Sequence, residues 1–354
     1  MSKRNMLLTA VGLVVLFAAS CYVQLEMDSY TRRIANLCLI YAIIGLSMNL
    51  TNGFAGQFSL GQAGFMAIGA YVVGIFTVPV ELRGNVFYAV PMNPLIADIE
   101  LPLWGALILG GVLAALFAFL VGTPVLRLHG DYLAIATLGF SEIIRIVITN
   151  AQSFTNGALG IKDIPTINDV RYIFVATAIV FIIVSCLINS SYGRAFKAIR
   201  EDEIAAEAMG INLFRHKNLA FMLSAFFAGI GGGLYATLLG TVDPKNFLFT
   251  LTYNFLLIIV LGGMGSITGS MLGSIIVTGG LEFLRVFDEP LMIMGMDIPL
   301  FRPGFRMVIF SILLMACVLF WRKGIMGTEE FTWEKFFSFC KNPFKYIWQK
   351  GASK

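Results

Sequence analysis

We single out four polar side chains in or just before the glycine-rich segment GFAGQFSLGQAGFMAIGAY, residues 53–71. They are Asn49, Gln57, Ser59 and Gln62. Amides and hydroxyls donate and accept hydrogen bonds, but alone they supply no activated nucleophile. They can therefore bind polar groups, either on neighbouring helices or on a solute that passes them. Glycine also permits a broken helix, so we expect a loop followed by a helix around residues 52–59.

Two acid–base pairs are spaced three residues apart, Glu142 with Arg145 and Glu282 with Arg285. Residues at i and i+3 share one face of a helix, where opposite charges can neutralise each other. We expect both to be structural pairs near helix ends, in preference to a relay for protons or ions.

No pattern in the sequence indicates a catalytic or metal site. His129 and His216 are far apart and have no neighbouring acid and nucleophile, and the five Cys residues share no metal-ligand spacing. The phosphate-binding motif GxxxxGK[ST] is absent. We therefore predict a protein that is not an enzyme and that holds no cofactor of its own.

The composition is typical of a membrane protein. Of the 354 residues, 58% are hydrophobic and 13% are charged, whereas soluble domains carry about 25% charged residues. This balance argues against disorder, nucleic-acid binding and a disulfide scaffold. We predict an all-α, polytopic integral membrane protein with about ten transmembrane helices of roughly 20 apolar residues each. The expected spans are residues 6–23, 34–50, 60–79, 103–121, 132–149, 172–189, 219–240, 251–262, 267–286 and 305–321.

The charges orient these spans. With the N-terminus inside, the inner segments hold about twice as many Lys and Arg residues as the outer loops, in line with the positive-inside rule. The outer loops carry acids instead, among them Glu81, Asp98 and Glu100. We expect cytoplasmic N- and C-termini, and a retained first span in preference to a cleaved signal peptide at residues 1–23.

The longest inner connection, residues 191–217, is also the most charged. Asp202 is a good N-cap, residues 204–209 favour a helix, and Gly210 is a typical helix stop. We expect short amphipathic helices that present small side chains between charges. The small residues are Ala205, Ala206 and Gly210, and the charged residues beside them are Arg194, Arg200, Glu201 and Glu207. A solvated loop is the simplest alternative, but small residues on a charged loop favour docking into another protein.

Glycines at four-residue spacing predict close helix packing. Gly265, Gly269 and Gly273 lie in GGMGSITGSMLGS, residues 262–274, and form two overlapping GxxxG motifs. Another helix, from this chain or a partner, should approach this face.

We divide the chain after residue 323. Residues 1–323 form the expected transmembrane domain. Residues 324–354 interleave Trp and Phe with Lys, which predicts a cytoplasmic, amphipathic helix in contact with lipid at the membrane interface.

Four blocks in order resemble the permease subunits of bacterial high-affinity branched-chain amino acid ABC importers, of the M type. They are LSMNLTNGFAGQFSLGQAGFMAIGAY, RLHGDYLAIATLGFSEIIRIV with TNGALGI, SYGRAFKAIREDEIAAEAMGIN, and LIIVLGGMGSITGSMLGS. The resemblance covers about residues 30–325 and implies the fold of type II ABC importer permeases. In such permeases the cytoplasmic coupling loop often reads EAA-xxx-G. Ala205, Ala206 and Gly210 match this motif, whereas Ile204 replaces its Glu.

The resemblance implies ATP-driven uptake of branched-chain, hydrophobic amino acids such as leucine across the bacterial inner membrane. The implied partners are two ATPase subunits, which bind the ATP, a related second permease subunit and an extracytoplasmic amino-acid-binding protein. Nucleic acid is not among them. The alternatives are an ABC permease for urea or short amides, an ion-coupled secondary carrier or channel, and a membrane scaffold that does not transport.

Overall fold

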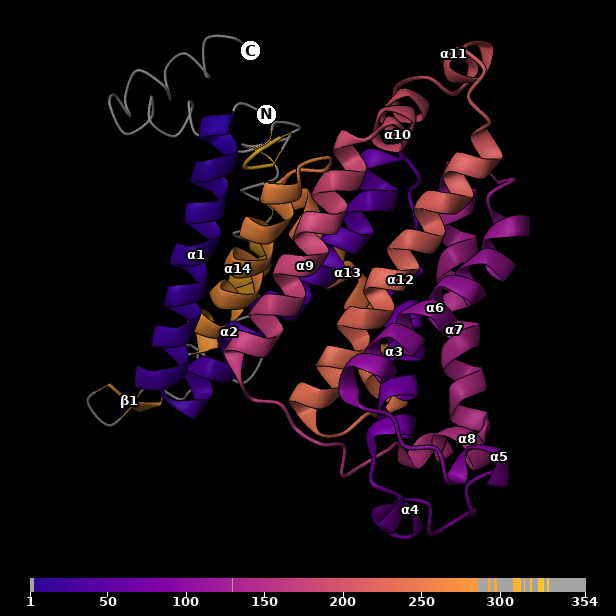
Figure 1. Ribbon diagram of the computed structural model, residues 1–354, viewed down its shortest axis with the longest axis vertical. Coiled ribbons are helices and arrows are strands. Elements are labelled where there is room, and N and C mark those ends of the chain that lie inside the picture. Colours follow the sequence, from indigo (N-terminus) through magenta and orange to yellow (C-terminus); the bar gives the residue numbers. More distant parts are fainter. Residues whose placement is uncertain are drawn as a thin grey trace.

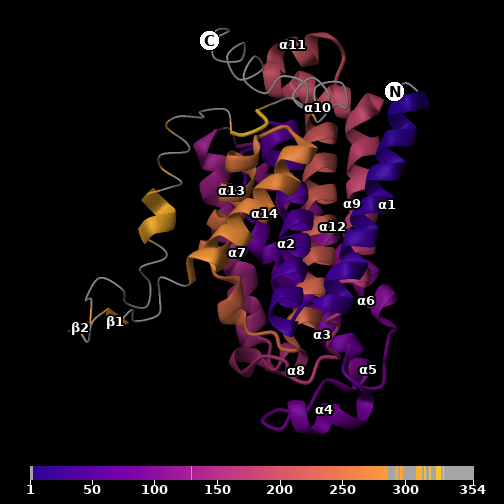
Figure 2. The same ribbon diagram turned by 90° about the vertical axis from the view of Figure 1, so that its left-hand side faces the viewer.

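The computed structural model describes residues 3–128, 130–285, 292–293, 296–297, 308–312, 315, 319, 324–327 and 330. Long helices dominate this part of the chain and run side by side in a bundle (Figures 1 and 2). One short antiparallel pair accompanies them, β1 (Met292–Ile293) with β2 (Met296–Asp297). The all-α prediction is confirmed.

Within the described residues, a helix stands at each of the first nine expected spans. These helices are α1 (Lys3–Glu26), α2 (Ser29–Asn49), α3 (Gln62–Thr77), α6 (Leu103–Val125), α7 (Asp131–Asn150), α9 (Val170–Asn189), α12 (Leu213–Leu239), α13 (Phe249–Gly262) and α14 (Ile267–Phe283). The tenth expected span, residues 305–321, lies largely outside the described residues.

Fewer helices than expected can cross a membrane on length and hydropathy alone. Five qualify, or six if α3 and α4 (Val80–Val86), which are bent by 118°, form one span. One reason is the length of α13 and α14, which have 14 and 17 residues. At 1.5 Å per residue they reach roughly 21 and 26 Å, less than the hydrocarbon core of about 30 Å.

The shorter elements lie at the two ends of the bundle. At one end, α10 (Ser191–Glu201) and α11 (Glu203–Ala208) lie level with the start of α1. At the other end lie α4, α5 (Pro94–Ala97) and α8 (Gln152–Thr155), as both views show (Figures 1 and 2). The prediction that the N-terminus and loop 191–217 share one side of the membrane requires this arrangement.

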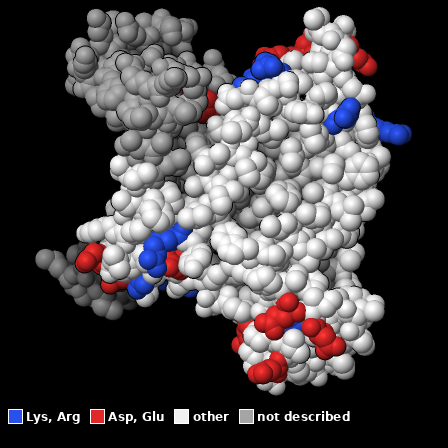
Figure 3. Space-filling model, in the orientation of Figure 1, with Lys and Arg blue, Asp and Glu red and all other residues white. Residues whose placement is uncertain are grey.

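Charged side chains gather at the same two ends. The face in Figure 3 has acids over α4 and α5, mixed charges over α10 and α11 and a further mixed group at its lower left, with a broad uncharged band between the top and the lower groups. Large apolar side chains such as Ile108, Leu116 and Ile179 are exposed on α6 and α9. Their contact with water would be unfavourable by about 25 cal/mol per Å², so this surface suits hydrocarbon. The protein is a polytopic membrane protein.

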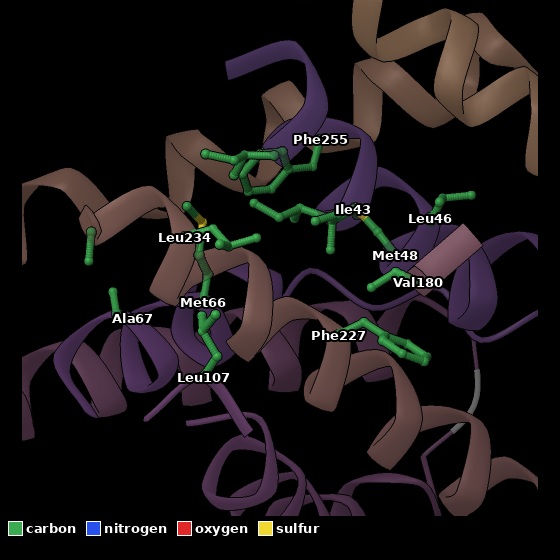
Figure 4. Close-up of a cluster of buried hydrophobic side chains, with 14 of the residues drawn as sticks. Ile43, Leu46, Met48, Met66, Ala67, Leu107, Val180, Phe227, Leu234 and Phe255 are labelled. Carbon is green, nitrogen blue, oxygen red and sulfur yellow. The ribbon is translucent and has the colours of Figure 1, made fainter. Parts of the chain in front are cut away.

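The core is centred on α2, α3 and α12. Figure 4 shows Ile43 of α2, Met66 of α3 and Leu234 of α12 in one buried cluster. Glycine lets these helices approach closely, because a Cβ atom on Gly69 would overlap the backbone of Gly229 across the α3–α12 contact.

The predicted glycine face of α14 packs against α13 of the same chain. A Cβ atom on Gly269 would lie 2.5 Å from the carbonyl oxygen of Gly262. A Cβ atom on Gly273 would overlap the carbonyl of Ile258. The expected position of Gly265 on this helix face is wrong, because Gly265 precedes α14 and has a φ of +90°. A right-handed helix cannot continue through that conformation, so Gly265 belongs to a turn and not to the helix face.

Candidate functional site

The second span ends in a break most of whose residues are buried. After α2 the chain forms a π-helical turn, η1 (Leu50–Phe54), and residues 55–61 are non-helical up to the start of α3. The predicted break is thus confirmed. Gly56, with a φ of +68°, supplies a backbone conformation that other residues adopt at a cost. Such π-turns occur frequently at functional sites.

Asn49 fixes the start of this break to α14. Its Nδ2 donates to the carbonyl oxygen of Ser266 at 2.8 Å and to Oγ of Ser270 at 2.7 Å. Its Oδ1 accepts from the backbone nitrogen of Gly265 at 2.8 Å. The side chain is fully buried, and both N–H donors and the amide oxygen form hydrogen bonds within the subunit. This placement favours the packing interpretation of Asn49.

Asn52 holds the non-helical segment, residues 55–61, in place. Its Nδ2 donates to the carbonyl oxygen of Ser59 at 3.1 Å, and its Oδ1 accepts from the backbone nitrogen of Ser59 at 3.2 Å. The side-chain amide therefore does what a neighbouring strand would do, and satisfies backbone groups that have no helical partner. Oγ of Ser59 accepts from the backbone nitrogen of Gly61 at 3.4 Å. Sequence reasoning missed the clamp by Asn52, because its partner lies seven residues away across a non-helical turn.

Gln62 joins three helices at the start of α3. Its Nε2 donates to Oγ of Ser47 on α2, and its Oε1 accepts from Oγ of Ser224 on α12 at 3.4 Å. Ser224 also donates to the carbonyl oxygen of Ser47 at 2.7 Å. The side chain of Gln62 is 3% exposed. Like Asn49, it is placed to hold helices together.

Gln57 differs from the other three candidates. It is buried, and neither its amide nitrogen nor its amide oxygen has a hydrogen-bond partner among the described residues. The residues on either side of it, Gly56 and Phe58, are exposed. Because Gln57 is buried and Phe58 is exposed, a path along the outer side of this segment would meet Phe58 and not Gln57. Exposed and buried residues alternate from Gly56 to Ser59. An expectation of such alternation in the sequence could have identified Phe58 as an exposed candidate.

The loop 191–217 contains short helices, as expected, namely α10 and α11, and ends in the first residues of α12. Oδ1 of Asp202 caps α11 by accepting from the backbone nitrogens of Ile204 and Ala205 at 2.9 and 3.0 Å. At the other end, the backbone nitrogen of Gly210 donates to Glu207 at 2.9 Å and that of Ile211 to Ala206 at 3.1 Å. These bonds form a Schellman motif, for which Gly210 supplies a φ of +85°. The predicted cap and stop are confirmed.

The exposed face of α11 is partly different from the expected one. Ala205, Glu207 and Gly210 are exposed, but Ala206 is only 4% exposed and packs on its own chain. Ala206 is therefore no part of the presented surface, because this face of the short helix packs inward. Ile204 and Met209 are instead 82% and 83% exposed. Ile204 was visible in the sequence only as a departure from the family motif.

Arg200 connects these helices to the break in the second span. Its Nη1 donates to the carbonyl oxygen of Gly53 in η1 at 3.0 Å. A Cβ atom on Gly56 would lie 2.9 Å from Cγ of Arg200, and one on Gly265 would lie 2.7 Å from its Nη1. Nη2 pairs with the exposed carboxylate of Glu201 at 2.5 Å. Arg194 is exposed to solvent.

A second ion pair ties α11 to the spans. Nζ of Lys217 on α12 lies 2.5 Å from Oε2 of Glu203, and the lysine side chain is 10% exposed. Together with Arg200, it anchors the two short helices to the bundle at two separate points.

Both predicted acid–base pairs form. Nε of Arg145 lies 2.7 Å from Oε2 of Glu142, and Nη1 of Arg285 lies 3.0 Å from Oε1 of Glu282. Glu282 stands at the end of α14, as expected, and also accepts from the hydroxyl of Tyr30. The expected position is wrong for the first pair, because Glu142 lies near the middle of α7.

At the opposite end of the bundle, Arg83 organises the long outer loop. Its guanidinium donates to the carbonyl oxygens of Val78, Ile96, Ala97 and Ile99 at 2.6 to 3.1 Å. Burial lowers the pKa of Arg83, and the nearby carboxylates of Glu100 and Asp98 oppose this change. Those two acids and Glu81 are exposed, so the loop presents negative charge to solvent.

A protein-family model described as branched-chain amino acid transport system / permease component matches residues 30–318. The chain belongs to this family. Over 295 residues it is 37% identical to the high-affinity branched-chain amino acid transport system permease protein LivM of Escherichia coli and 36% identical to LivM of Salmonella typhimurium. The aligned part is 74% of this chain and spans 65% of each relative's length.

A shorter match links the chain to a second kind of permease. Over 87 residues it is 37% identical to LivH of Salmonella typhimurium, the alignment covering 25% of this chain and 28% of LivH. The comparison with solved structures gives no significant match.

Proposed function

We propose that this protein is the membrane-spanning permease subunit of an ATP-driven importer of branched-chain amino acids in the bacterial inner membrane. The family and the branched-chain amino acid transport of the LivM relatives support the substrate class. The observation that carries the coupling part is the exposed tip at α11. Ile204 on α11 and Met209 directly after it are more than four-fifths exposed, and α11 stands out from the bundle (Figure 1). Bulky apolar side chains in such a place suit a protein partner.

The proposed partners follow from this arrangement. Two ATPase subunits bind ATP, so this chain needs no ATPase site, and one of them receives α11 together with Ala205, Glu207 and Gly210. A related second permease completes the membrane domain, and the match to LivH supports its presence. An extracytoplasmic amino-acid-binding protein docks at the acidic loop around Arg83. The chain termini and α10–α11 then lie in the cytoplasm.

The contacts of α10 and α11 suggest how nucleotide-driven motion reaches the spans. A displacement of α11 acts on α12 through the Glu203–Lys217 pair. A displacement of α10 acts on η1 through the bond from Arg200 to the carbonyl oxygen of Gly53. Because α10 and α11 have two anchors, they can move with the helices as a rigid body.

Met209→Glu tests this proposal, with Leu95→Glu as the matched control. Both residues are large, apolar and about equally exposed, at 83% and 80%, but Leu95 lies on α5 at the other end. A buried charge at a protein interface weakens docking, so Met209→Glu should lose the ATPase subunits on co-purification and lose ATP-driven leucine uptake. Leu95→Glu should keep its ATPase subunits.

Two results would contradict the proposal. One is normal co-purification and uptake by Met209→Glu. The other is leucine transport by the purified chain alone, in liposomes without ATP, which would indicate a carrier or channel.

A further inference from the structure

The pair Glu142–Arg145 lies where a charged pair is unexpected. α7 runs from Asp131 to Asn150, so Glu142 is roughly 16 Å along the helix from its first residue at 1.5 Å per residue. The side chains of Arg145 and Glu142 are 24% and 23% exposed. Ionised side chains at such a depth are costly against lipid, and they generally face protein or a wet path.

Arg145 retains unused hydrogen-bonding capacity. A guanidinium carries five N–H donors, and among the described residues Arg145 uses only Nε, toward Oε2 of Glu142 at 2.7 Å. Its two terminal amino groups have no partner in that part of the chain. They form the planar edge that binds a carboxylate through two parallel hydrogen bonds.

The surface around the pair combines polar and apolar groups. The backbone nitrogen of Phe249, at the start of α13, donates to Oε1 of Glu142 at 3.3 Å. Thr250 and Asn254 are exposed on the same helix, four residues apart and therefore on one face. The short helix α13 thus begins beside the middle of α7, and it carries exposed polar side chains in its first two turns. Both helices are labelled in Figure 2.

On α7 itself, one helical face contains the pair and an open space. Gly139 precedes Glu142 by three residues, and a Cβ atom on it would meet nothing within 4 Å. Ile135 and Ile146 continue this face in both directions and are 67% and 50% exposed. An aliphatic residue, an open position, the charged pair and a second aliphatic residue therefore follow one another within about three turns of one helix.

We propose that Glu142 and Arg145 bind the zwitterionic head group of an aliphatic α-amino acid on its way through the membrane. Arg145 receives the carboxylate, Glu142 the ammonium group, and the aliphatic side chain lies in the space over Gly139 between the two isoleucines. Binding adds no net charge, because a neutral pair meets a neutral zwitterion. This site rests on the proposed function, which supplies the amino acid as substrate.

The second pair, Glu282–Arg285, provides a matched control. It has the same spacing and sign, but Arg285 is 56% exposed at the end of α14, and Tyr30 contributes to its hydrogen bonds. Because this second pair is so exposed and lies at a helix end, we expect no substrate to be held there during its passage through the membrane.

The experiment measures ATP-driven uptake of radiolabelled leucine by the complete importer in liposomes, with its binding protein present. The variants are Arg145→Gln, the double variant Glu142→Gln with Arg145→Gln, and the control Arg285→Gln. Loss of charged hydrogen bonds should reduce uptake by Arg145→Gln about tenfold or more. The double variant should be equally impaired, although it has no unbalanced charge. Arg285→Gln should transport normally, and all three should co-purify with ATPase subunits as the wild type does.

Wild-type uptake by the double variant would overturn the inference. In that case the two charges would only neutralise each other and would not bind substrate. Loss of a partner subunit from Arg145→Gln would also overturn it and assign the pair to a subunit interface. Gly139→Leu gives an independent readout, since it fills open space and should impair uptake without loss of assembly. If the wild-type complex itself shows no ATP-driven leucine uptake, the proposed function fails. If it does and the double variant does too, only this site fails.

Discussion

At the scale of single residues, the side chains that hold the broken span are amides whose partners lie far away in sequence. Asn49 bonds to residues more than 200 positions later, and Asn52 replaces a missing strand for Ser59. A buried polar group that loses its partner costs more than the bond contributed. These residues therefore fix the geometry of the break, because apolar side chains in their place would form no directional hydrogen bonds.

Asn49→Ala tests that role. The change leaves the backbone nitrogen of Gly265 and Oγ of Ser270 without their present partner in a buried place, so we expect a loss of about 2–4 kcal/mol of stability. A lower melting temperature of the purified protein in detergent measures it. Asn150→Ala is the control, because Asn150 is exposed and, within the described part of the chain, its Nδ2 bonds only to the carbonyl oxygen of Ile146. Equal melting temperatures for the two variants would contradict the role of Asn49.

At the scale of elements, the sequence indicated which helices exist better than how they begin and pack. The break after α2 was predictable because glycine and polar residues interrupt an apolar span. The face of α11 was not, because only tertiary packing turns Ala206 inward and Met209 outward. Spacing alone also placed Gly265 on a helix, since a residue count carries no information about a φ of +90°.

The start of α14 has an unusual cap, which the sequence did not indicate. Oε1 of Glu330 accepts from the backbone nitrogen of Ile267 at 2.7 Å, and Oε2 from that of Thr268 at 3.2 Å and from its hydroxyl at 3.0 Å. Nearby, the backbone nitrogens of Ile325 and Met326 donate to Leu261 and Gly262 at the end of α13. The first residues after position 323 therefore join α13 and α14, whereas the rest of the predicted interfacial tail lies outside the described residues.

Glu330→Ala should loosen this junction. A carboxylate at a helix N-terminus both caps backbone nitrogens and interacts favourably with the helix dipole, so its removal should cost about 1–2 kcal/mol. Glu330→Gln keeps an acceptor oxygen and should cost less. Hydrogen exchange of the first-turn amides of α14, compared among the three proteins, measures the effect, and equal exchange in all three would show that the cap does not stabilise α14.

At the scale of the whole molecule, three observations describe one arrangement. The charged ends, the uncharged band between them (Figure 3) and the common end of α1 and α10–α11 all fit a bundle that crosses the membrane with α11 on one side and α5 on the other. The positive-inside rule predicts that α11 lies on the cytoplasmic side. The short α13, the broken second span and the half-buried pair on α7 interrupt the apolar pattern, and each does so where helices meet other helices.

Labelling of single cysteines decides this orientation. In a variant whose five Cys residues are replaced by Ser, Met209→Cys and Leu95→Cys each introduce one thiol at a position that is 83% or 80% exposed. A charged maleimide that does not cross membranes should label Leu95→Cys in intact spheroplasts and Met209→Cys only in inverted vesicles. Both side chains are equally open in the bundle, so only the membrane can separate their reactions. The opposite pattern would place α11 outside, where no ATPase could reach it, and labelling of both from one side would mean that the band in Figure 3 does not span the membrane.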